Sequence, residues 1–570
     1  MSRLAIVDYE KCKPTKCNKE CIKYCPPMRQ DKECIRIDDI EDIGKKASIS
    51  NSICIGCGIC VKKCPFNAIQ IVNLPKQLTD DKIFHSYGEN AFRLFSCIQL
   101  KSNSCIGILG ANGLGKSTLL KLLSGELKVD LSNKHIKKMI GGNEIYKYLL
   151  NIKRKNISYK PQDTIAMYGK DDAVVSEILK SVDNDMIHSL NLAKLSGRTF
   201  NELSGGEQQR LLIAKCCSEK ADIYLFDEPT AFLDIKQRIK MANTINKVRT
   251  PTNYVMCVDH DLCIFDYVCD YVTCLYGEPG CYGVITSLYS TFNGINSYLD
   301  GYFKKENIKF RAQPIKFKMV NMSDQTNPII PDTIKINEHI YPDDVVRHGD
   351  QFTLNIENGS FRKGEVVLLI GENGTGKTTF IEHLAKTCTS KHDSASGFKI
   401  SYKRQNPYTD LSVYGDKTVE DVLASKSLIY NATYVSMVLK PMKIDKLYEL
   451  KVCNLSGGQA QRVSLALCLG IKADIFLLDE PSAYIDVDDR LHMAKIIRRY
   501  ARLYNKTVFI VDHDIVMASN ISDNVIVFSG EPGVNCTALT PKPLGMGIND
   551  FLKSINVTIH KSMQSGRPRI

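Results

Sequence analysis

Two glycine-rich loops of the chain read Gly110-Ala-Asn-Gly-Leu-Gly-Lys-Ser117 and Gly371-Glu-Asn-Gly-Thr-Gly-Lys-Thr378. Both match G-x-x-x-x-G-K-[ST], and each follows an apolar run, Cys105–Leu109 or Val366–Ile370, that predicts a buried strand. Such loops turn consecutive backbone N–H groups inward, where they hold phosphates at the start of a helix. The two loops therefore predict two α/β domains, each with a phosphate site.

Both loops belong to a longer internal repeat. The stretch Leu203-Ser-Gly-Gly-Glu207 recurs as Leu455-Ser-Gly-Gly-Gln459, about 250 residues later. Further pairs at nearly the same offset are Asp227-Glu228 with Asp479-Glu480, Val258–Asp261 with Val511–Asp514, and Gly277–Gly280 with Gly530–Gly533. The chain is therefore expected to contain two copies of one domain.

Length and composition limit the classes of protein to consider. The chain has 570 residues, 44% of them hydrophobic and 24% charged, as expected for several globular domains and not for a disordered chain. The longest purely aliphatic run, Val366–Ile370, is far shorter than the ~18 residues that span a bilayer. Met1–Glu10 lacks the apolar core of a signal peptide. The formal net charge of +12 suits a protein that works near an anion such as nucleic acid.

Each copy carries residues suited to binding Mg²⁺ and the phosphates of a nucleotide. The loop lysine can neutralise the β- and γ-phosphates, and the hydroxyl beside it can bind Mg²⁺. An aspartate that ends an apolar strand lies where doubly wound sheets bind ligands, and it should hold Mg²⁺ directly or through water. These candidates are Lys116, Ser117 and Asp227 in the first copy and Lys377, Thr378 and Asp479 in the second.

Two further positions in each copy suit hydrolysis. Glu228 and Glu480 directly follow those aspartates, where a carboxylate can orient or deprotonate the attacking water. His260 and His513 follow another apolar strand and are expected to hydrogen-bond the γ-phosphate. A lone histidine is usually structural, but a histidine repeated at a fixed distance from the carboxylates indicates a shared role.

The repeated Leu-Ser-Gly-Gly stretch resembles the signature of ATP-binding-cassette (ABC) ATPases. In that family the signature of one cassette faces the γ-phosphate bound by the other, so the resemblance implies two shared sites. Site one would combine Gly110, Asn112, Gly113, Gly115, Lys116, Ser117, Thr118, Gln162, Asp227, Glu228 and His260 with Ser456, Gly457 and Gly458. Site two would combine Gly371, Asn373, Gly374, Gly376, Lys377, Thr378, Thr379, Gln405, Asp479, Glu480 and His513 with Ser204, Gly205 and Gly206.

The resemblance assigns further roles. Gln162 and Gln405 would join the magnesium ligands, and Asp234 and Asp486 resemble the D-loop that crosses the interface. Four aromatic residues precede the glycine-rich loops and are candidates for stacking on adenine, with core packing as the alternative. They are Tyr87 and Phe92 in the first copy and Tyr341 and Phe352 in the second.

Cysteine is concentrated at the N-terminus. The pattern is Cys12-x4-Cys17-x3-Cys21-x3-Cys25-Pro followed by Cys54-x2-Cys57-x2-Cys60-x3-Cys64-Pro, with Cys34 left over. The second run fits the bacterial ferredoxin motif, in which the fourth cysteine of each run ligates the other cluster. We therefore expect two [4Fe-4S] clusters, one on Cys12, Cys17, Cys21 and Cys64 and one on Cys54, Cys57, Cys60 and Cys25. Structural zinc is the alternative, although it favours two separated Cys-x2-4-Cys knuckles.

The first copy also contains an insertion of about 18 residues within 128–157. The insertion is rich in lysine, and Asn143–Lys153 places Ile145, Tyr148, Leu149 and Ile152 on one face of a predicted helix. Two hypotheses fit this pattern equally well: a solvated surface helix, or a docking element for a polyanion or protein.

The whole chain resembles the ribosome-recycling ATPases of ABC subfamily E, the RNase L inhibitor family. The most specific stretches are Ile6–Pro14, Ile53–Cys60, Gly371–Phe380 and Arg567–Ile570. The resemblance implies an α/β fold of two tandem ATP-binding-cassette P-loop domains, preceded by a two-cluster ferredoxin-like α+β iron–sulfur domain. The implied parts are the iron–sulfur domain (1–75), the first cassette with a basic helix–loop–helix insertion near 128–157 (76–293), the hinge and linker (294–335), the second cassette (336–545), and the C-terminal hinge and basic tail (546–570).

The resemblance also implies a function: ATP-driven splitting of ribosomes into subunits after termination or stalling, with a link to translation initiation through the small subunit. ATP binding would close the cassettes and swing the iron–sulfur domain. The implied partners are the small ribosomal subunit, with its rRNA and protein, a peptide-release factor or its stalled-ribosome homologue, and initiation factors. The implied protein is a cytoplasmic, and also nuclear, monomer whose cassettes form an intramolecular dimer.

Some positions depart from the family pattern. The second glutamine loop reads Lys403-Arg-Gln405 where Lys-Pro-Gln is usual, Asp259 and Asp512 replace glutamate, and Phe292-Asn293 replaces Arg-Glu in the hinge. The alternative hypotheses are an iron–sulfur redox protein with ATP-gated electron transfer and another soluble ABC ATPase of translation. A transporter subunit would not need a cysteine-rich domain, and a DNA-repair ATPase of the long-coil type would need a longer segment between Lys116 and Ser204.

Overall fold

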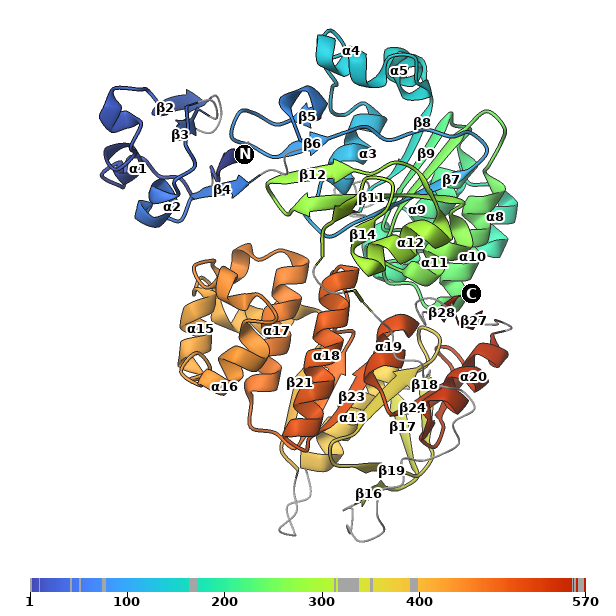
Figure 1. Cartoon of the computed structure of the whole chain (residues 1–570). Coiled ribbons are helices and arrows are strands. Elements are labelled where there is room, and N and C mark those ends of the chain that lie inside the picture. The colour runs from blue at the N-terminus through green and yellow to red at the C-terminus, as the bar shows by residue number, and fades with distance from the viewer. Residues whose placement is uncertain are drawn as a thin grey trace.

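Figure 1 shows a small N-terminal lobe beside two larger lobes that lie against each other. The computed structural model describes residues 3–9, 11–40, 44–50, 53–73, 78–162, 173–311, 314–315, 338–348, 352–389, 398–555, 557, 560–561 and 568–569. Within these ranges no helix has both the length and the apolar character needed to span a bilayer.

The N-terminal lobe is a small α+β domain. Strand β1 (Arg3–Val7) pairs antiparallel with β4 (Ile69–Asn73), and β2 (Ile35–Ile40) pairs antiparallel with β3 (Gly44–Ile49). Two short helices, α1 (Glu20–Lys23) and α2 (Ile59–Lys63), contact each other. Cysteine side chains form much of the core of this lobe. A domain this small and poor in aliphatic side chains depends on cross-links or bound metal for its stability.

One buried residue of the first large lobe attaches the N-terminal lobe. The Asn90 side chain donates hydrogen bonds to the carbonyl oxygens of Ala5 (2.9 Å) and Ile49 (2.7 Å) and accepts one from the Ile49 N–H (2.7 Å). The second large lobe contacts the N-terminal lobe through an exposed hydrogen bond from Asn67 Nδ2 to Glu449 Oε1 (2.5 Å). The N-terminal lobe is therefore held firmly on one side and loosely on the other.

The first large lobe is built on a nine-stranded sheet in the order β5-β6-β12-β11-β7-β10-β9-β8, with β13 paired to β11. Its central strands β11, β7, β10, β9 and β8 run parallel, as the apolar strands before the motifs predict. The strands are β5 (Ile83–Ser86), β6 (Arg93–Phe95), β7 (Cys105–Leu109), β8 (Ile157–Lys160), β9 (Ile223–Asp227), β10 (Tyr254–Val258), β11 (Tyr271–Glu278), β12 (Tyr282–Ile285) and β13 (Tyr289–Ser290).

The helices of this lobe start at the motifs. Helix α3 begins at the loop lysine, α9 begins directly after Ser204, and α10 is capped by Asp234, whose side chain accepts a hydrogen bond from the Gln237 N–H. The described helices are α3 (Lys116–Ser124), α4 (Lys134–Ile140), α5 (Glu144–Leu150), α7 (Val175–Leu179), α8 (Asn184–Ser189), α9 (Gly205–Ser218), α10 (Ile235–Lys247), α11 (Leu262–Val268) and α12 (Thr291–Asp300).

The insertion forms a helix–loop–helix at the top of Figure 1. The predicted helix at Asn143–Lys153 appears as α5, whose Ile145, Tyr148 and Leu149 are buried. The Tyr148 hydroxyl donates a hydrogen bond to the Leu123 carbonyl (2.6 Å), which fixes α5 on the end of α3. Helix α4 precedes α5 and turns its lysines outward.

The second large lobe repeats the same sheet in the order β17-β18-β25-β24-β20-β23-β22-β21, with β26 paired to β24. Its strands are β17 (Asp344–His348), β18 (Phe352–Ile356), β20 (Val366–Ile370), β21 (Ile400–Lys403), β22 (Ile475–Asp479), β23 (Thr507–Val511), β24 (Asn524–Glu531), β25 (Asn535–Ala538) and β26 (Lys542–Pro543). Its helices are α13 (Lys377–Thr389), α14 (Pro407–Leu411), α15 (Val419–Ser425), α16 (Ala432–Tyr434), α17 (Gly457–Gly470), α18 (Val487–Leu503), α19 (Ile515–Ile521) and α20 (Leu544–Ser554).

Two predicted domain limits fall inside helices. Helix α12 crosses the limit at 293–294 and packs on β11 of the first sheet, and α20 crosses the limit at 545–546 and packs on β24 of the second. Each helix thus packs on the sheet that precedes it in the sequence and belongs to that cassette. Short antiparallel pairs flank the sheets: β14 (Tyr302–Phe303) with β15 (Ile308–Lys309), β16 (Glu338–Tyr341) with β19 (Gly359–Arg362), and β27 (His560–Lys561) with β28 (Pro568–Arg569).

The two large lobes are joined by buried contacts. The Arg311 guanidinium donates to both carboxylate oxygens of Asp488 at 2.7 Å. Ile235 of α10 packs into a core cluster with Ile370 and Ala518 of the second lobe. The loops that carry the motifs therefore face each other across this contact.

Candidate functional site

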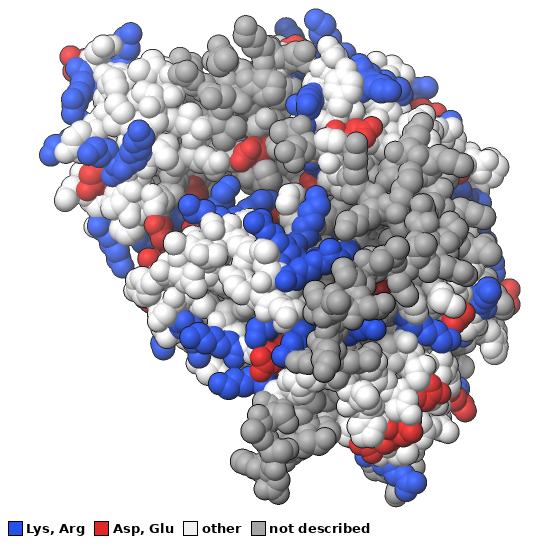
Figure 2. All heavy atoms as spheres, turned by 60° about the horizontal axis from the view of Figure 1, so that its bottom comes forward, with Lys and Arg blue, Asp and Glu red and all other residues white. Residues whose placement is uncertain are grey.

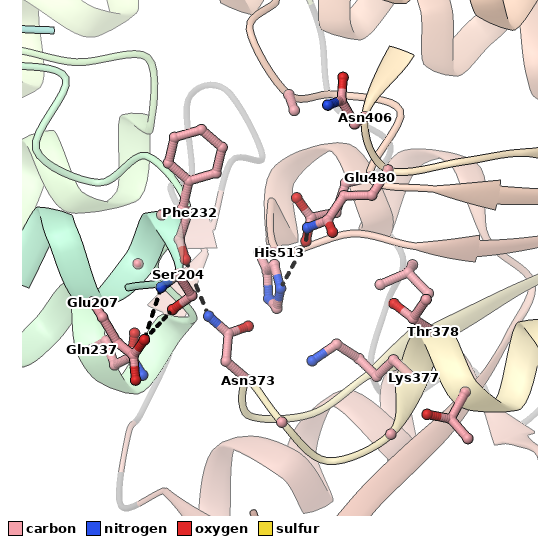
Figure 3. A pocket seen from close by; sticks show the side chains of 18 of the residues that line it. Ser204, Glu207, Phe232, Gln237, Asn373, Lys377, Thr378, Asn406, Glu480 and His513 are labelled. Carbon is pink, nitrogen blue, oxygen red and sulfur yellow. Dashed lines mark hydrogen bonds and ion pairs between the residues drawn. The ribbon is translucent and has the colours of Figure 1, made fainter. Parts of the chain in front are cut away.

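A cavity of about 830 Å³ lies between the two lobes and contains most of the residues predicted for site two (Figure 3). From the first lobe it is lined by Ser204, Gly205, Gly206, Glu207, Phe232 and Gln237. From the second lobe it is lined by Asn373, Gly374, Gly376, Lys377, Thr378, Thr379, Gln405, Glu480 and His513. The structure thus brings the signature of one copy against the glycine-rich loop of the other.

The second glycine-rich loop closes around its own lysine. Lys377 Nζ donates to the carbonyl oxygens of Gly371 (2.9 Å) and Glu372 (2.7 Å), and burial lowers the Lys377 pKa to about 8. At Gly376 the φ angle is +90°, and a Cβ atom there would lie 2.8 Å from the Phe352 ring. This position therefore requires glycine, and the loop surrounds a cationic centre that an anionic ligand would stabilise.

The carboxylates of site two sit where a metal–nucleotide complex would need them. Thr378 Oγ1 donates to Asp479 Oδ2 (2.9 Å), and Gln405 Nε2 donates to Glu480 Oε1 (2.8 Å). His513 Nε2 lies 3.6 Å from Glu480 Oε1. Burial, reinforced by neighbouring Asp479, raises the pKa of Glu480, and burial lowers the pKa of His513 well below its usual value. The histidine is therefore neutral at pH 7, and the glutamate is a stronger base than an exposed carboxylate.

Site one repeats the contacts that site two makes within its own cassette, whereas Ser456, Gly457 and Gly458 do not line either cavity described between the lobes. Lys116 Nζ donates to the carbonyl oxygen of Gly110 (2.8 Å), and Ser117 Oγ donates to Asp227 Oδ2 (3.2 Å). His260 Nε2 lies 3.6 Å from Glu228 Oε1. Burial raises the pKa of Glu228 and lowers that of His260, as in site two. Gln162 and both catalytic glutamate candidates line a smaller central cavity between the lobes.

The two D-loop aspartates reach across the interface. Asp234 Oδ2 accepts a hydrogen bond from the Asn373 N–H (2.9 Å), and Asp486 Oδ2 accepts one from the Asn112 N–H (3.1 Å). The other oxygen of each aspartate caps its own helix. Each aspartate therefore connects the helix after its own strand to the glycine-rich loop of the opposite copy.

The four aromatic candidates separate into different environments. Tyr87 is exposed, and its hydroxyl lies 3.2 Å from Thr118 Oγ1 beside the first loop. Phe92 and Phe352 lie under the glycines of their own loops. For Tyr341 the structure differs from the prediction. Its side chain is only 9% exposed, and its ring packs edge-on against the Phe380 ring with the centroids 6.1 Å apart, because β16 places it in the core. For Tyr341 the core-packing alternative describes the structure.

Several residues at these sites were not predicted from the sequence. Phe232 and Tyr484 precede the D-loops, have φ angles of +62° and +63°, and meet at the interface with their ring centroids 5.8 Å apart. The repeated aromatic-x-Asp pattern of the two copies could have indicated both residues. Asp259, the departure from glutamate, accepts hydrogen bonds from Thr230 Oγ1 (2.7 Å) and the His260 N–H (2.6 Å), so the shorter side chain still ties the switch loop to the neighbouring turn.

The cysteines surround two separate cavities. One is lined by Cys12, Cys17, Cys21 and Cys64. The other is lined by Cys25, Cys34, Cys54, Cys57 and Cys60. Among the described residues, no three His, Cys, Asp or Glu side chains are close enough to share one metal ion. A cubane instead binds each thiolate to its own iron, so a cradle of four thiols and a cradle of five, each with the four predicted ligands, fit the predicted clusters.

The cysteine that was left over lies inside the second cradle. Cys34 is 2% exposed, and its thiol is hydrogen-bonded to the thiols of Cys25 and Cys54. Burial raises the pKa of Cys34 to about 12 and that of Cys60 to about 12. Four thiolates suffice for a cubane, so one of the five thiols there is not needed as a ligand, and the hypothesis is that this thiol is Cys34.

Replacing Cys34 by Ser should therefore keep about eight irons per chain, whereas replacing Cys25 or Cys64 should remove cluster absorbance. Serine preserves a hydrogen-bond donor beside Cys25 and Cys54, and the ligand variants each leave one iron without a thiolate. Iron analysis and visible absorbance of the purified variants measure this. Equal iron loss in C34S and C64S would make Cys34 a ligand.

Comparisons with known proteins agree with this arrangement. A family model described as "ABC transporter" matches residues 97–231 and 354–483. The models "Possible Fer4-like domain in RNase L inhibitor, RLI" and "4Fe-4S binding domain" match residues 2–33 and 47–70. The chain is therefore an ATP-hydrolysing ABC ATPase with a domain that binds [4Fe-4S] iron–sulfur groups.

The similarity extends over the whole chain. "Translation initiation factor rli1" of Schizosaccharomyces pombe is 41% identical over 100% of this chain and 96% of that protein. The structure described as "Model of ribosome-bound archaeal Pelota and ABCE1" matches with a TM-score of 0.87 and 39% identity, covering 100% of this chain and 96% of that one. A crystal structure of archaeal ribosomal stalk protein aP1 with archaeal ribosome recycling factor aABCE1 matches with a TM-score of 0.76 and 36% identity, covering 86% and 96%. Because the first two of these matches cover the whole chain, with its cysteine-rich lobe and both cassettes, the chain belongs to the ABC subfamily E, or RNase L inhibitor, family.

Proposed function

We propose that this chain binds and hydrolyses ATP at two composite sites between its cassettes and uses the resulting closure to split ribosomes into subunits. The proposal includes a second role in translation initiation, exerted on the small subunit. The observation that carries it is the cavity in which Ser204 of one cassette faces Lys377 of the other. ATP at this position would contact both cassettes and hold them together.

The residues divide the work at each site. Lys116 and Lys377 would neutralise the phosphates, and the neutral His260 and His513 would donate a hydrogen bond to the γ-phosphate. Mg²⁺, when bound, would offset the charge that develops on the phosphates, held by Ser117, Asp227 and Gln162 in site one and by Thr378, Asp479 and Gln405 in site two. Glu228 and Glu480 would then take the proton of the attacking water, because burial strengthens them as bases.

Closure would reach the ribosome through the iron–sulfur lobe. Asn90 fixes that lobe to the first cassette through buried hydrogen bonds, whereas the hydrogen bond from Asn67 to Glu449 of the second cassette is exposed. Movement of one cassette against the other would therefore carry the lobe along. Two [4Fe-4S] clusters, one in each thiol cradle, would keep the lobe rigid enough to transmit force.

Relatives indicate the partners. Their names include a translation initiation factor, a ribosome-bound complex with Pelota and a complex with a ribosomal stalk protein. For this chain we infer binding to rRNA and protein of the small subunit, to a release factor or its stalled-ribosome homologue, and to initiation factors. Figure 2 shows lysine and arginine side chains spread over one face of the molecule, in keeping with the net charge of +12 and an anionic partner.

A splitting assay tests the proposal. Purified chain, ATP and a release factor should convert whole ribosomes into subunits on a sucrose gradient, and the chain should sediment with the small subunit. ATP replaced by ADP is the matched control, because ADP lacks the γ-phosphate that bridges the cassettes. Ribosomes that stay whole under every nucleotide condition would contradict the proposed function.

The insertion offers a further test. Reversing Lys137, Lys138, Lys153 and Arg154 to Glu should weaken small-subunit binding and flatten its salt dependence, because fewer phosphates are neutralised. These side chains are exposed, whereas Lys155 is half-buried and pairs with Asp222 (2.8 Å), so Lys155 is left in place. The ATPase rate without ribosomes should not change.

The matched control reverses the same number of exposed lysines in the second cassette: Lys417, Lys426, Lys440 and Lys446. If both sets weaken binding equally, net charge alone would explain the result. If neither does, the insertion is a solvated surface element.

A further inference from the structure

Two lysines are completely buried beside the catalytic carboxylates and have no part in the roles described above. Lys160 ends β8 and Lys403 ends β21, and they are 1% and 0% exposed. An ammonium group is seldom buried without hydrogen-bond partners, because removing its charge from water is costly. Both side chains therefore need partners, and three of the four carbonyl oxygens that accept from them lie at the end of the neighbouring strand or directly after it.

In the first cassette the partners are the carbonyl oxygens at the end of β9. Lys160 Nζ donates to Asp227 O at 2.7 Å and to Glu228 O at 3.2 Å. These are the backbone groups of the magnesium candidate and of the candidate base. The Lys160 side chain thus fixes the backbone of both residues, and their carboxylates remain available for Mg²⁺ and the attacking water.

The backbone at the base needs such support. Glu228 has a φ angle of +47°, and Glu480 has +43°, in the left-handed region that is unfavourable for residues with a side chain. This turn redirects the carboxylate from the strand direction into the site, and Figure 3 shows Glu480 beside His513 at the cavity wall. Strained conformations of this kind persist only where surrounding contacts fix them.

In the second cassette, two side chains make the corresponding contacts to the backbone. Lys403 Nζ donates to Asp479 O (3.1 Å) and to Arg404 O (2.8 Å). Gln461 Nε2, on the buried face of α17, donates to Glu480 O (3.1 Å). The carbonyl of the second base is therefore held by an amide of the signature helix rather than by the lysine.

We propose that Lys160 and Lys403 are positioning residues for ATP hydrolysis, whose ammonium groups fix the ends of the catalytic strands so that the following glutamate stays aimed at the nucleotide. The inference rests on the two proposed ATP sites and adds a difference between them. Both turns share the same backbone hydrogen bonds, from the glutamate N–H to Val258 or Val511. Among the described side chains, Lys160 donates to the carbonyls of both acidic residues in site one, whereas in site two Lys403 and Gln461 each donate to one of them.

The test measures ATP hydrolysis by the free chain, one site at a time. E480Q leaves site one active, and E228Q leaves site two active. With E480Q, K160M should lower kcat for ATP by ~10- to 100-fold and change KM by less than about twofold, because misplacing a catalytic group costs rate rather than binding. With E228Q, K403M should lower kcat by less than about fivefold, and K403M combined with Q461L should reach the loss seen for K160M.

Ser158 provides the matched control. It is 2% exposed, lies two residues before Lys160 on the same strand face, and donates to the Cys216 carbonyl (3.1 Å) instead of the catalytic strand. S158A should lower the thermal midpoint without changing kcat. In site two, S401A serves the same purpose, since Ser401 donates to the Cys468 carbonyl (2.8 Å).

Three outcomes would overturn the proposal: an unchanged kcat in K160M, a rise in KM that accounts for the whole loss, or equal losses of kcat in K160M and S158A. If K160M does not fold, the comparison of K403M with its Q461L double variant decides the question in site two. Loss of ribosome splitting with normal ATPase would count against the proposed function and leave this inference intact. If neither single-glutamine background hydrolyses ATP because the uncut nucleotide holds the cassettes closed, K160M and K403M are compared in the otherwise unchanged chain, where K160M should again lower kcat more.

Discussion

Replacing Glu228 and Glu480 together by Gln should reduce ATP turnover by about 10²- to 10⁴-fold while ATP remains bound. Glutamine has the size and hydrogen-bonding groups of glutamate but cannot accept the proton of the attacking water. The Mg²⁺ and phosphate candidates, Asp227 and Lys116 in site one and their counterparts in site two, are unchanged. Steady-state phosphate release and retention of labelled ATP on the purified variant measure the two effects.

The same variant should leave the chain trapped on the small subunit. ATP in the cavity bridges Ser204 and Lys377, so an uncut nucleotide keeps the cassettes together. Splitting should still occur once per chain, because closure and not hydrolysis drives it. A variant that binds ATP but fails to associate stably with small subunits would contradict this account. A normal turnover rate would remove Glu228 and Glu480 from the catalytic list.

Replacing Asn90 by Ala should have the opposite effect and separate hydrolysis from splitting. The change removes three hydrogen bonds at a buried position, at a cost of about 0.5–1.5 kcal/mol for each bond. The iron–sulfur lobe should then no longer follow the first cassette. We expect the splitting rate to fall by at least about tenfold while ATPase activity without ribosomes stays within about twofold.

The matched control is N67A, which removes the exposed hydrogen bond to Glu449 on the second cassette. An exposed bond of this kind contributes little to stability, so splitting should change only slightly. Iron content of both variants shows whether the lobe remains intact. Equal losses in N90A and N67A, or an N90A variant that splits at the normal rate, would show that Asn90 does not carry the movement.

Short stretches of sequence predicted the elements of the nucleotide sites and the cysteines of the iron–sulfur sites. The spacing of Lys116 and Lys377 within their loops predicts a strand, a turn and a helix, and the structure has β7 with α3 and β20 with α13 at these positions. The cysteine runs predict two sets of four thiols, and the structure arranges them around two cavities. The helical face of the insertion predicts α5. Short-range backbone geometry decides the loops and α5, whereas the exchange of Cys25 and Cys64 between the two cysteine sets depends on how the two runs pack against each other.

Several assignments failed or were missed because the residue type alone is ambiguous. Tyr341 precedes its loop much as Tyr87 does, yet one is buried and the other exposed. Cys34 lies outside both runs but inside the second cradle. No role was predicted for Lys160 or Lys403. Burial decides the role of each of these residues, and burial depends on neighbours that are distant in the sequence.

By itself the sequence determined two phosphate loops, two thiol quartets and the family, because each of these is encoded in residues a few positions apart. Only the tertiary structure decided which residues from distant segments of the chain these motifs contact. It placed Ser204 opposite Lys377, tied Asp234 to the loop of the other cassette, and set Lys160 against the backbone of Glu228. The first two pairings arise when two separately folded sheets dock, and the third arises when β8 pairs with β9 within one sheet. No local periodicity records any of them, since a polar side chain that meets a partner distant in sequence has the same pattern as one that meets water.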